Sequence, residues 1–312
     1  MTSFAFVFPG QGSQAVGMLD AWGDHPAVRE TLAEASAALG EDLAALIHTG
    51  PKDQLDLTTN TQPVMLTAGI ACYRAWLAET GLRPAAVAGH SLGEYTALVA
   101  AGSLSLADAL PLVRLRAQAM QQAVPVGVGA MAAILGMDAD GVRAGCEQAA
   151  QASGEAVEAV NFNDPKQTVI AGTKAGVDKA CELLKAAGAK RALLLAVSAP
   201  FHSSLMKPAA ERLKAHLAEV AIAAPAIPVV NNIDVQAASE PDAIRDALYR
   251  QAFGPVRWVE VVQALRARGL SHIVECGPGK VLAGMVRRID ADAVSACVFD
   301  PASLAEVKGL LS

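Results

Sequence analysis

The feature that most constrains this chain is a serine flanked by glycines, in the segment Gly-His-Ser-Leu-Gly at residues 89–93. The preceding residues 84–88 are an apolar run that predicts a short β-strand. Residues 92–101 are uncharged apart from Glu94 and predict a buried α-helix. Strand, tight turn and helix in this order form the setting of a nucleophile elbow, which exposes the serine hydroxyl at the amino end of the helix. Ser91 is therefore the candidate nucleophile.

Length and composition favour an α/β protein with a parallel sheet that is covered on both faces. Of the 312 residues, 53% are hydrophobic and 18% are charged, which is enough to bury a large core. A net charge of −6 argues against a nucleic-acid partner, because phosphate binding requires an excess of Lys and Arg. The five cysteines are dispersed and the six histidines lack metal-ligand spacing. We therefore expect reduced thiols in a cytoplasmic protein and no metal site.

The sequence indicates neither a signal peptide nor a membrane span. The first 20 residues have no basic region followed by a long apolar stretch. A long uncharged stretch at residues 117–137 is interrupted by Gln, Pro and Gly, and is better interpreted as a helix end, a loop and a strand. We expect no membrane association.

The order of predicted elements divides the chain into two parts. A run of strand, helix, strand, strand, helix and strand is predicted at residues 130–135, 139–152, 156–161, 167–171, 174–187 and 191–197. This βαββαβ order is that of a ferredoxin-like fold. We therefore predict a large α/β-hydrolase-like domain of residues 1–125 and 199–312, interrupted by a small ferredoxin-like domain of residues 126–198.

A serine hydroxyl requires a base and a site for the oxyanion that its attack creates. His202, in a proline-containing loop after the last strand of the small domain, is the candidate base. His90 is a weaker candidate, because adjacent side chains at a sharp turn point apart. The backbone N–H of Leu92, directly after the serine, and that of Gln11, in the glycine-rich loop after the first strand, are the candidate oxyanion donors.

Six short motifs occur in an ordered set that is specific to one family. They are Pro-Gly-Gln-Gly-Ser-Gln at 9–14, Thr-Gln-Pro at 61–63, Gly-His-Ser-Leu-Gly-Glu-Tyr at 89–95, Asn-Phe-Asn at 161–163, Pro-Phe-His-Ser at 200–203 and Pro-Val-Arg-Trp at 255–258. Together they resemble the malonyl-CoA:acyl carrier protein transacylases of bacterial fatty-acid synthesis and the related acyltransferase domains of polyketide synthases. The resemblance covers essentially the whole chain.

The resemblance implies that Ser91 is the acylated nucleophile and His202 its general base and acid, with Leu92 and Gln11 as oxyanion donors. Arg116 matches the arginine that holds the free carboxylate of the malonyl group. A guanidinium is always charged and can bind a carboxylate through two hydrogen bonds, which suits that role. Its neighbour Arg114 should face elsewhere on the predicted helix.

Four more residues match pocket positions of the family. Phe201 resembles the residue that narrows the malonyl pocket against an α-methyl branch, and Gln251 the glutamine whose backbone carbonyl orients the histidine. Gln62 and Met131 match pocket-lining positions, although plain core packing is an alternative for Met131.

The implied function is ping-pong transfer of a malonyl group from malonyl-CoA to the phosphopantetheine thiol of acyl carrier protein, through a malonyl-serine. We expect a monomer that needs no cofactor. The carrier proteins of this pathway are acidic, so we expect docking through basic side chains. Candidates for that contact are Lys190, Arg191, Lys207, Lys280, Arg287 and Arg288.

Three other functions stay open at this point. One is an acyltransferase that loads a polyketide synthase, and another is a non-catalytic module that docks carrier protein. The third is a serine esterase or thioesterase of the α/β-hydrolase type. Such a hydrolase needs an acid between serine and histidine in chain order, and Asp138, Glu158 and Asp164 are the candidates.

Overall fold

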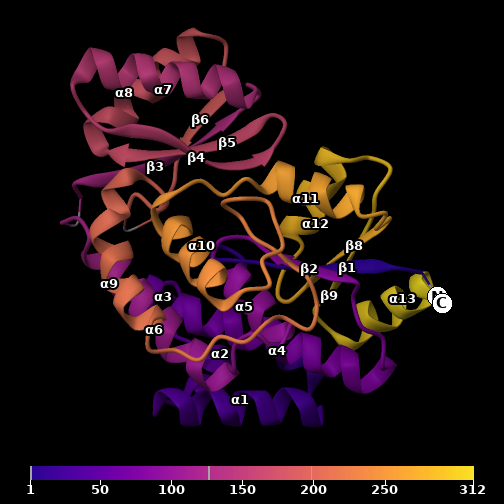
Figure 1. Ribbon diagram of the computed structural model, residues 1–312. Helices are drawn as coiled ribbons and strands as arrows, with labels where there is room; N and C mark the ends of the chain where they lie inside the picture. The colour runs from indigo at the N-terminus through magenta and orange to yellow at the C-terminus, as the bar shows by residue number, and fades with distance from the viewer. Residues whose placement is uncertain (1, 126, 198) are drawn as a thin grey trace.

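The structure, a computed structural model, describes residues 2–125, 127–197 and 199–312. It contains two sheets (Figure 1), which we call sheet A and sheet B. Sheet A is parallel and has the strand order β7-β2-β1-β8-β9. Its strands are β1 (Phe4–Phe8), β2 (Ala86–Gly89), β7 (Val229–Val230), β8 (His272–Cys276) and β9 (Val294–Val298). The predicted parallel sheet is confirmed.

Helices cover both faces of sheet A, which is why every residue of β1 is buried. The three phenylalanines of β1 point into the larger hydrophobic core, whereas Ala5 and Val7 point into a smaller one. The larger core is built with α1 (Pro26–Leu39), α2 (Leu43–Thr49), α3 (Lys52–Leu55), α4 (Thr58–Thr80), α5 (Gly93–Ala100), α6 (Leu106–Gln122), α9 (Lys207–Leu217), α10 (Pro241–Phe253) and α13 (Pro301–Leu311). On the opposite face, the smaller core is built with α11 (Trp258–Ala267) and α12 (Val281–Ile289).

Sheet B is antiparallel, with the strand order β4-β5-β3-β6. Its strands are β3 (Gly129–Leu135), β4 (Val157–Asp164), β5 (Gln167–Thr173) and β6 (Arg191–Leu194), and one face is covered by α7 (Ala139–Ser153) and α8 (Lys174–Ala186). The predicted βαββαβ order is confirmed. Strand β6 ends at Leu194 and is shorter than expected. The Leu195 N–H still donates to Met131 O on β3 at 2.9 Å, and residues 195–197 line a cavity.

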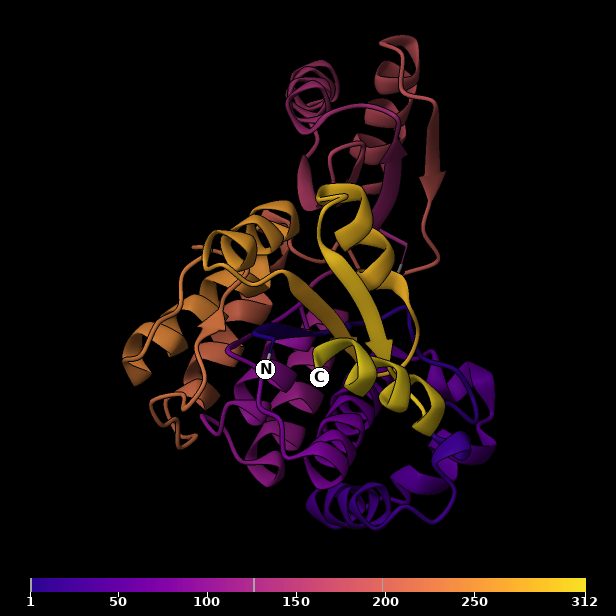
Figure 2. The same ribbon diagram turned by 90° about the vertical axis from the view of Figure 1, so that its right-hand side faces the viewer.

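Sheet B stands beside sheet A (Figure 2). Hydrogen bonds, as well as the chain, join it to the segments around α11 and α12 that cover sheet A. Val256, just before α11, forms a parallel bridge to β4: its N–H donates to Val160 O at 2.8 Å, and Phe162 N–H donates to its carbonyl at 2.9 Å. Arg288 at the end of α12 pairs with Asp164 at 2.6 Å. The predicted domain boundaries fall at residues 126 and 198, which lie outside the described residues, so that division stays a prediction.

The structure also contains elements that the sequence pattern did not predict. Strand β9 and helices α2, α3, α10 and α13 are among them. Pro63 lies inside α4, although proline is most common at the first residue of a helix. In the described part of the chain, no helix is both long enough and apolar enough to span a membrane.

Candidate active site

Ser91 lies on a tight turn between β2 and α5 that only glycine-flanked backbone can form. Its φ is +52°, in the left-handed region that residues with a Cβ rarely adopt. A Cβ on Gly89 would lie 1.9 Å from the carbonyl of Gly93, and a Cβ on Gly93 would lie 2.0 Å from Phe8 O. Both glycines are therefore required for the turn to pack against β1. The elbow predicted from the sequence is present.

A buried asparagine holds the elbow from the neighbouring strand. Asn232 lies two residues after β7. Its Oδ1 accepts the Ser91 N–H at 2.7 Å, and its Nδ2 donates to Gly89 O at 2.7 Å. Its own N–H donates to Glu94 Oε2 at 2.7 Å. Sequence reasoning missed this residue. The signal was its place at the carboxyl end of a short apolar strand, where the side chains of parallel strands converge.

His202 is placed to act as a base on Ser91. The serine Oγ lies 2.7 Å from His202 Nε2, and His202 Nδ1 lies 2.9 Å from the backbone carbonyl of Gln251. Because a carbonyl only accepts hydrogen bonds, Nδ1 carries the proton and Nε2 is free to accept from the serine. Burial and the positive charge of Arg116 lower the pKa of His202 to about 3. The imidazole is therefore neutral at physiological pH.

Arg116, on α6, is buried beside the serine. Its Nη1 donates to Gln62 Oε1 at 2.8 Å, and its Nη2 donates to Ser91 Oγ and to Gln251 Oε1, both at 3.1 Å. Among the described residues, no carboxylate lies within ion-pair distance of this guanidinium, which is only 2% exposed. Arg114 turns away and pairs with Glu41 at 2.6 Å, as expected.

Gln251 joins the base, the arginine and the elbow. In addition to the carbonyl that binds His202, its side-chain Nε2 donates to Ser91 O at 3.0 Å and to Glu94 Oε2 at 3.1 Å. Burial raises the pKa of Glu94 to about 7. The backbone role of Gln251 was predicted, whereas the contacts of its amide and of Glu94 were not, because they depend on how α10 packs against the elbow.

Leu92 and Gln11 line the same cavity as Ser91. The Leu92 side chain is 1% exposed and belongs to the core, so its backbone is the part that faces the cavity. Neither backbone N–H takes a hydrogen-bond partner among the described residues. Leu92 also stands at the amino end of α5, where the helix dipole favours negative charge. Both groups are thus available to a developing oxyanion.

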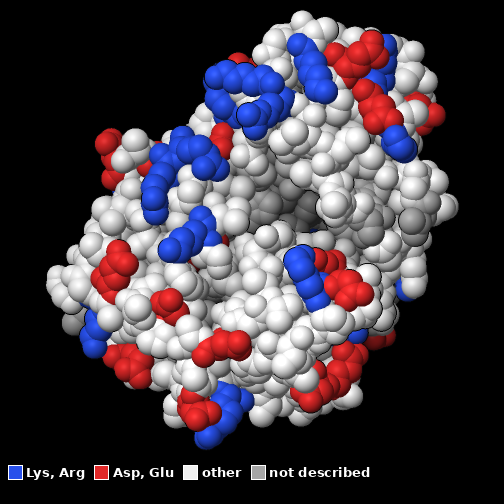
Figure 3. Space-filling view, turned by 180° about the vertical axis from the view of Figure 1, so that it is seen from behind, with Lys and Arg blue, Asp and Glu red and all other residues white. Residues whose placement is uncertain are grey.

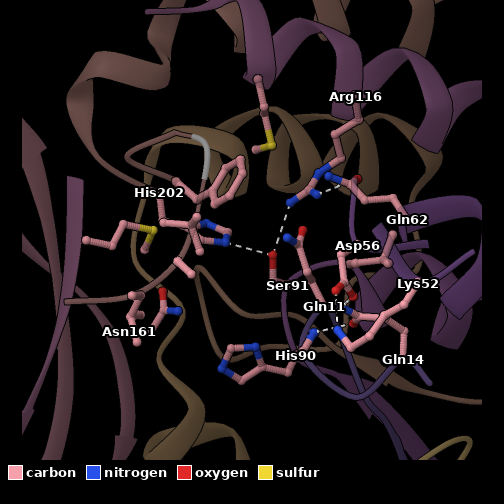
Figure 4. A pocket seen from close by; sticks show the side chains of 18 residues that line it. Gln11, Gln14, Lys52, Asp56, Gln62, His90, Ser91, Arg116, Asn161 and His202 are labelled. Carbon is pink, nitrogen blue, oxygen red and sulfur yellow. Dashed lines mark hydrogen bonds and ion pairs between the residues drawn. The ribbon is translucent and has the colours of Figure 1, made fainter. Parts of the chain in front are cut away.

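The cavity has a volume of about 500 Å³ and opens between the two sheets (Figure 4). Sheet A and its helices supply Ser91, Gln62 and Arg116, whereas β3 supplies Met131. Phe201 lines the cavity and packs against the cluster of Met131, and this methionine is both buried in that cluster and part of the cavity wall.

Among the residues that the structure describes, no acid is hydrogen-bonded to His202, whose partners are Ser91 and the Gln251 carbonyl. Asp138 caps α7, Glu158 binds Ser204, and Asp164 pairs with α12. His90 likewise turns away from Ser91 and lies 2.8 Å from an asparagine on β4. Across the described residues, no group of three or more His, Cys, Asp and Glu side chains could hold a metal ion.

Comparison with known proteins identifies close relatives over the full length. Residues 5–303 match the family described as the acyl transferase domain. The malonyl CoA-acyl carrier protein transacylase of Escherichia coli strain K12 is 53% identical over 306 residues, 98% of either chain.

Two solved structures show the same architecture. An acyl-carrier-protein S-malonyltransferase from Burkholderia pseudomallei 1710b is 66% identical, with a TM-score of 0.97 over 99% of this chain and 100% of the other. A malonyl-transacylase solved in complex with a type II PKS acyl-carrier protein is 47% identical, with a TM-score of 0.97 over 99% of this chain and 100% of that one.

Proposed function

This chain belongs to the acyl transferase family, and from that premise we propose that it transfers malonyl groups from malonyl-CoA to acyl carrier protein in fatty-acid synthesis. Relatives that are named for this transfer match nearly its whole length. The observation that carries the proposal is the pair of Ser91 with a buried Arg116, since a nucleophile and an unneutralised cation lie 3.1 Å apart.

The first half-reaction acylates Ser91. His202 Nε2 takes the proton of the serine hydroxyl as Oγ attacks the thioester carbonyl of malonyl-CoA, while the N–H groups of Leu92 and Gln11 stabilise the oxyanion. The Oγ–C bond forms, the C–S bond breaks, and the CoA sulfur leaves with the proton from His202.

Arg116 selects the acyl group. The malonyl carboxylate would bind the guanidinium of Arg116, which without substrate contacts only neutral partners. This pairing also offsets the positive charge that lowers the pKa of His202. Bound malonyl-CoA therefore makes its own base stronger, which an acetyl group does not do.

The second half-reaction repeats these steps in reverse with a different thiol. The phosphopantetheine thiol of the carrier protein enters the cavity, gives its proton to His202 and attacks the malonyl-serine ester. The solved complex of a relative with its carrier protein supports this partner. Phe201 and Met131 narrow the cavity beside the acyl group, which disfavours an α-methyl branch by about 1–3 kcal/mol.

The proposed chemistry uses neither a cofactor nor a metal, because base, clamp and oxyanion donors all belong to the chain. We place the reaction in the cytoplasm. All five cysteines are free, and four of them are buried, which suits a reducing compartment.

Intact-mass measurement after incubation with malonyl-CoA tests the function. We expect a malonyl adduct on the wild type and none on Ser91→Ala. Adding carrier protein should discharge the adduct to the carrier, whereas rapid loss to water without carrier malonylation would support the hydrolase. A Ser91→Ala protein that still becomes malonylated would refute the scheme.

A further inference from the structure

The loop of residues 9–14 after β1 carries the Gln11 N–H but has little regular structure of its own. It contains two glycines, and Gly12 has a φ of +106°. Gln11 and Gly12 are both exposed. A backbone donor on such a loop stabilises a developing charge only when its surroundings fix its position beforehand.

Close packing holds the two ends of this loop but not its tip. A Cβ on Gly277 would lie 3.1 Å from Pro9 Cδ, and a Cβ on Gly279 would lie 3.2 Å from Ser13 Cβ. These contacts fix the loop where it leaves β1 and again at its far end. A Cβ on Gly12, in contrast, would meet no atom within 4 Å. A Cβ on Gly10 would lie 2.6 Å from His90 O, so close packing reaches the residue before Gln11. On the other side of Gln11, the position of Gly12 depends on side-chain hydrogen bonds.

A chain of side-chain contacts ties the tip to α3 (Figure 4). The Gly12 N–H donates to Gln14 Oε1 at 2.7 Å, and Gln14 Nε2 donates to Asp56 Oδ1 at 2.9 Å. Asp56 in turn pairs with Lys52. The hydrogen bonds from Lys52 and Gln14 hold the pKa of Asp56 below its ordinary value, so this acceptor stays ionised.

The segment at the other end of this chain is well anchored. Leu55 is fully buried, and its carbonyl accepts the hydroxyl of Thr61 on α4 at 2.7 Å. Thr58, at the start of α4, accepts a second contact from the loop, because Gln11 Nε2 donates to its Oγ1 at 3.2 Å. Hydrogen bonds thus link the tip of the loop to α4, the helix that also carries Gln62.

We propose that Gln14 and Asp56 are positioning residues that hold the Gln11 N–H where the thioester oxygen develops its charge. The proposal rests on the proposed function, which requires an oxyanion at this place. Both side chains line the cavity, but neither hydrogen-bonds to the serine or the arginine, and their chain of hydrogen bonds ends at the Gly12 N–H. Their loss should therefore lower kcat for both half-reactions and leave KM for malonyl-CoA unchanged.

A double-mutant cycle tests the proposal. We expect Gln14→Ala and Asp56→Ala each to lower kcat about tenfold, a fraction of what loss of an oxyanion donor costs. The double variant should lose the same tenfold, because both changes break one chain of hydrogen bonds. Asp56→Asn keeps an oxygen acceptor and should recover most of the rate. Asp53→Ala, which removes an exposed carboxylate from the same helix, is the matched control and should leave kcat unchanged.

Three outcomes would overturn the positioning role: unchanged kcat in the single variants, independent losses that multiply in the double variant, or a rise in KM for malonyl-CoA. The malonyl adduct of the wild type, measured by intact mass in the same series, reports on the proposed function separately. A wild type that forms the adduct beside variants of unaltered rate removes only the positioning role. A wild type without adduct removes both.

Discussion

At the scale of single residues, we propose that Arg116 decides which acyl group the site accepts. It was separable from Arg114 in the sequence because two residues along a helix face different directions, and the structure places one at the serine and the other at Glu41. The contacts that the Gln251 amide and the Asn232 side chain make with the elbow could not be predicted in this way. Their partners depend on sheet register and helix packing, which no local pattern encodes.

Replacing Arg116 by alanine should remove the preference for a diacid thioester. Truncating one partner of a buried charge pair costs about 2–5 kcal/mol, so kcat/KM for malonyl-CoA should fall on the order of a hundredfold or more. The rate with acetyl-CoA should change far less. Arg114→Ala is the control from the same helix and should keep the wild-type ratio. Equal losses for both thioesters in Arg116→Ala would contradict the role as a clamp.

At the scale of elements, the spacing of apolar residues was enough to predict an element that has a distinct apolar face or a continuous apolar run. The whole of sheet B with its two helices was predictable for this reason, as were β1 and β2. Strand β9 and helix α13 lie beyond the last motif. Helix α10 has a polar pattern, and its buried residues pack mainly against α9, with Gln251 at the elbow. Their positions follow from tertiary packing.

Helix α12 carries two of the basic side chains that we expect to contact the carrier protein, Arg287 and Arg288. Lys and Arg side chains gather along one side of the hollow between the sheets (Figure 3). Of the expected docking residues on this helix, Arg288 is already paired with Asp164, whereas Arg287 is exposed and has no ion-pair partner among the described residues. Arg287 is therefore the better docking residue.

Charge reversal in Arg287→Glu should raise KM for carrier protein several-fold at low salt and leave that for malonyl-CoA unchanged, because rim charges act mainly on encounter. Lys308→Glu makes the same change of net charge on α13 and serves as the control. Steady-state kinetics over a salt series would measure both. Equal effects of the two variants would show a response to net charge alone.

At the scale of the whole molecule, different buried ionisable groups make the free energy of unfolding depend on pH in opposite directions. Burial raises the pKa of Glu275 and of Glu94 to about 7, so each destabilises the fold as pH rises from the unfolded value of 4.5 toward 7. His202 has the opposite sign. Its pKa of about 3 makes the fold gain stability as pH rises from about 3 to 6.5.

Glu275→Gln isolates one of these contributions. Glu275, on β8, accepts the Ala283 N–H at 2.8 Å, and a glutamine oxygen can replace that acceptor without a charge. Relative to the wild type, the variant should gain on the order of 2 kcal/mol of unfolding free energy between about pH 5 and pH 8. Urea unfolding at both pH values measures this. Glu306→Gln, exposed on α13, is the control, and a difference that is independent of pH would contradict the assignment.

The bridge between Val256 and β4 has a consequence for exchanging parts between relatives. Ser91, His202 and Arg116 belong to the predicted large domain, whereas Met131, Asn161 and residues 195–197 form the opposite wall of the cavity. Replacing residues 127–197 by those of a relative would thus change one wall of the cavity and leave Ser91, His202 and Arg116 in place. Such a chimera has a third seam besides its two chain junctions, where Val160 and Phe162 exchange backbone hydrogen bonds with Val256. These hydrogen bonds join backbone N–H and C=O groups, which nearly every residue carries. The seam therefore tolerates new side chains but not a shift in register.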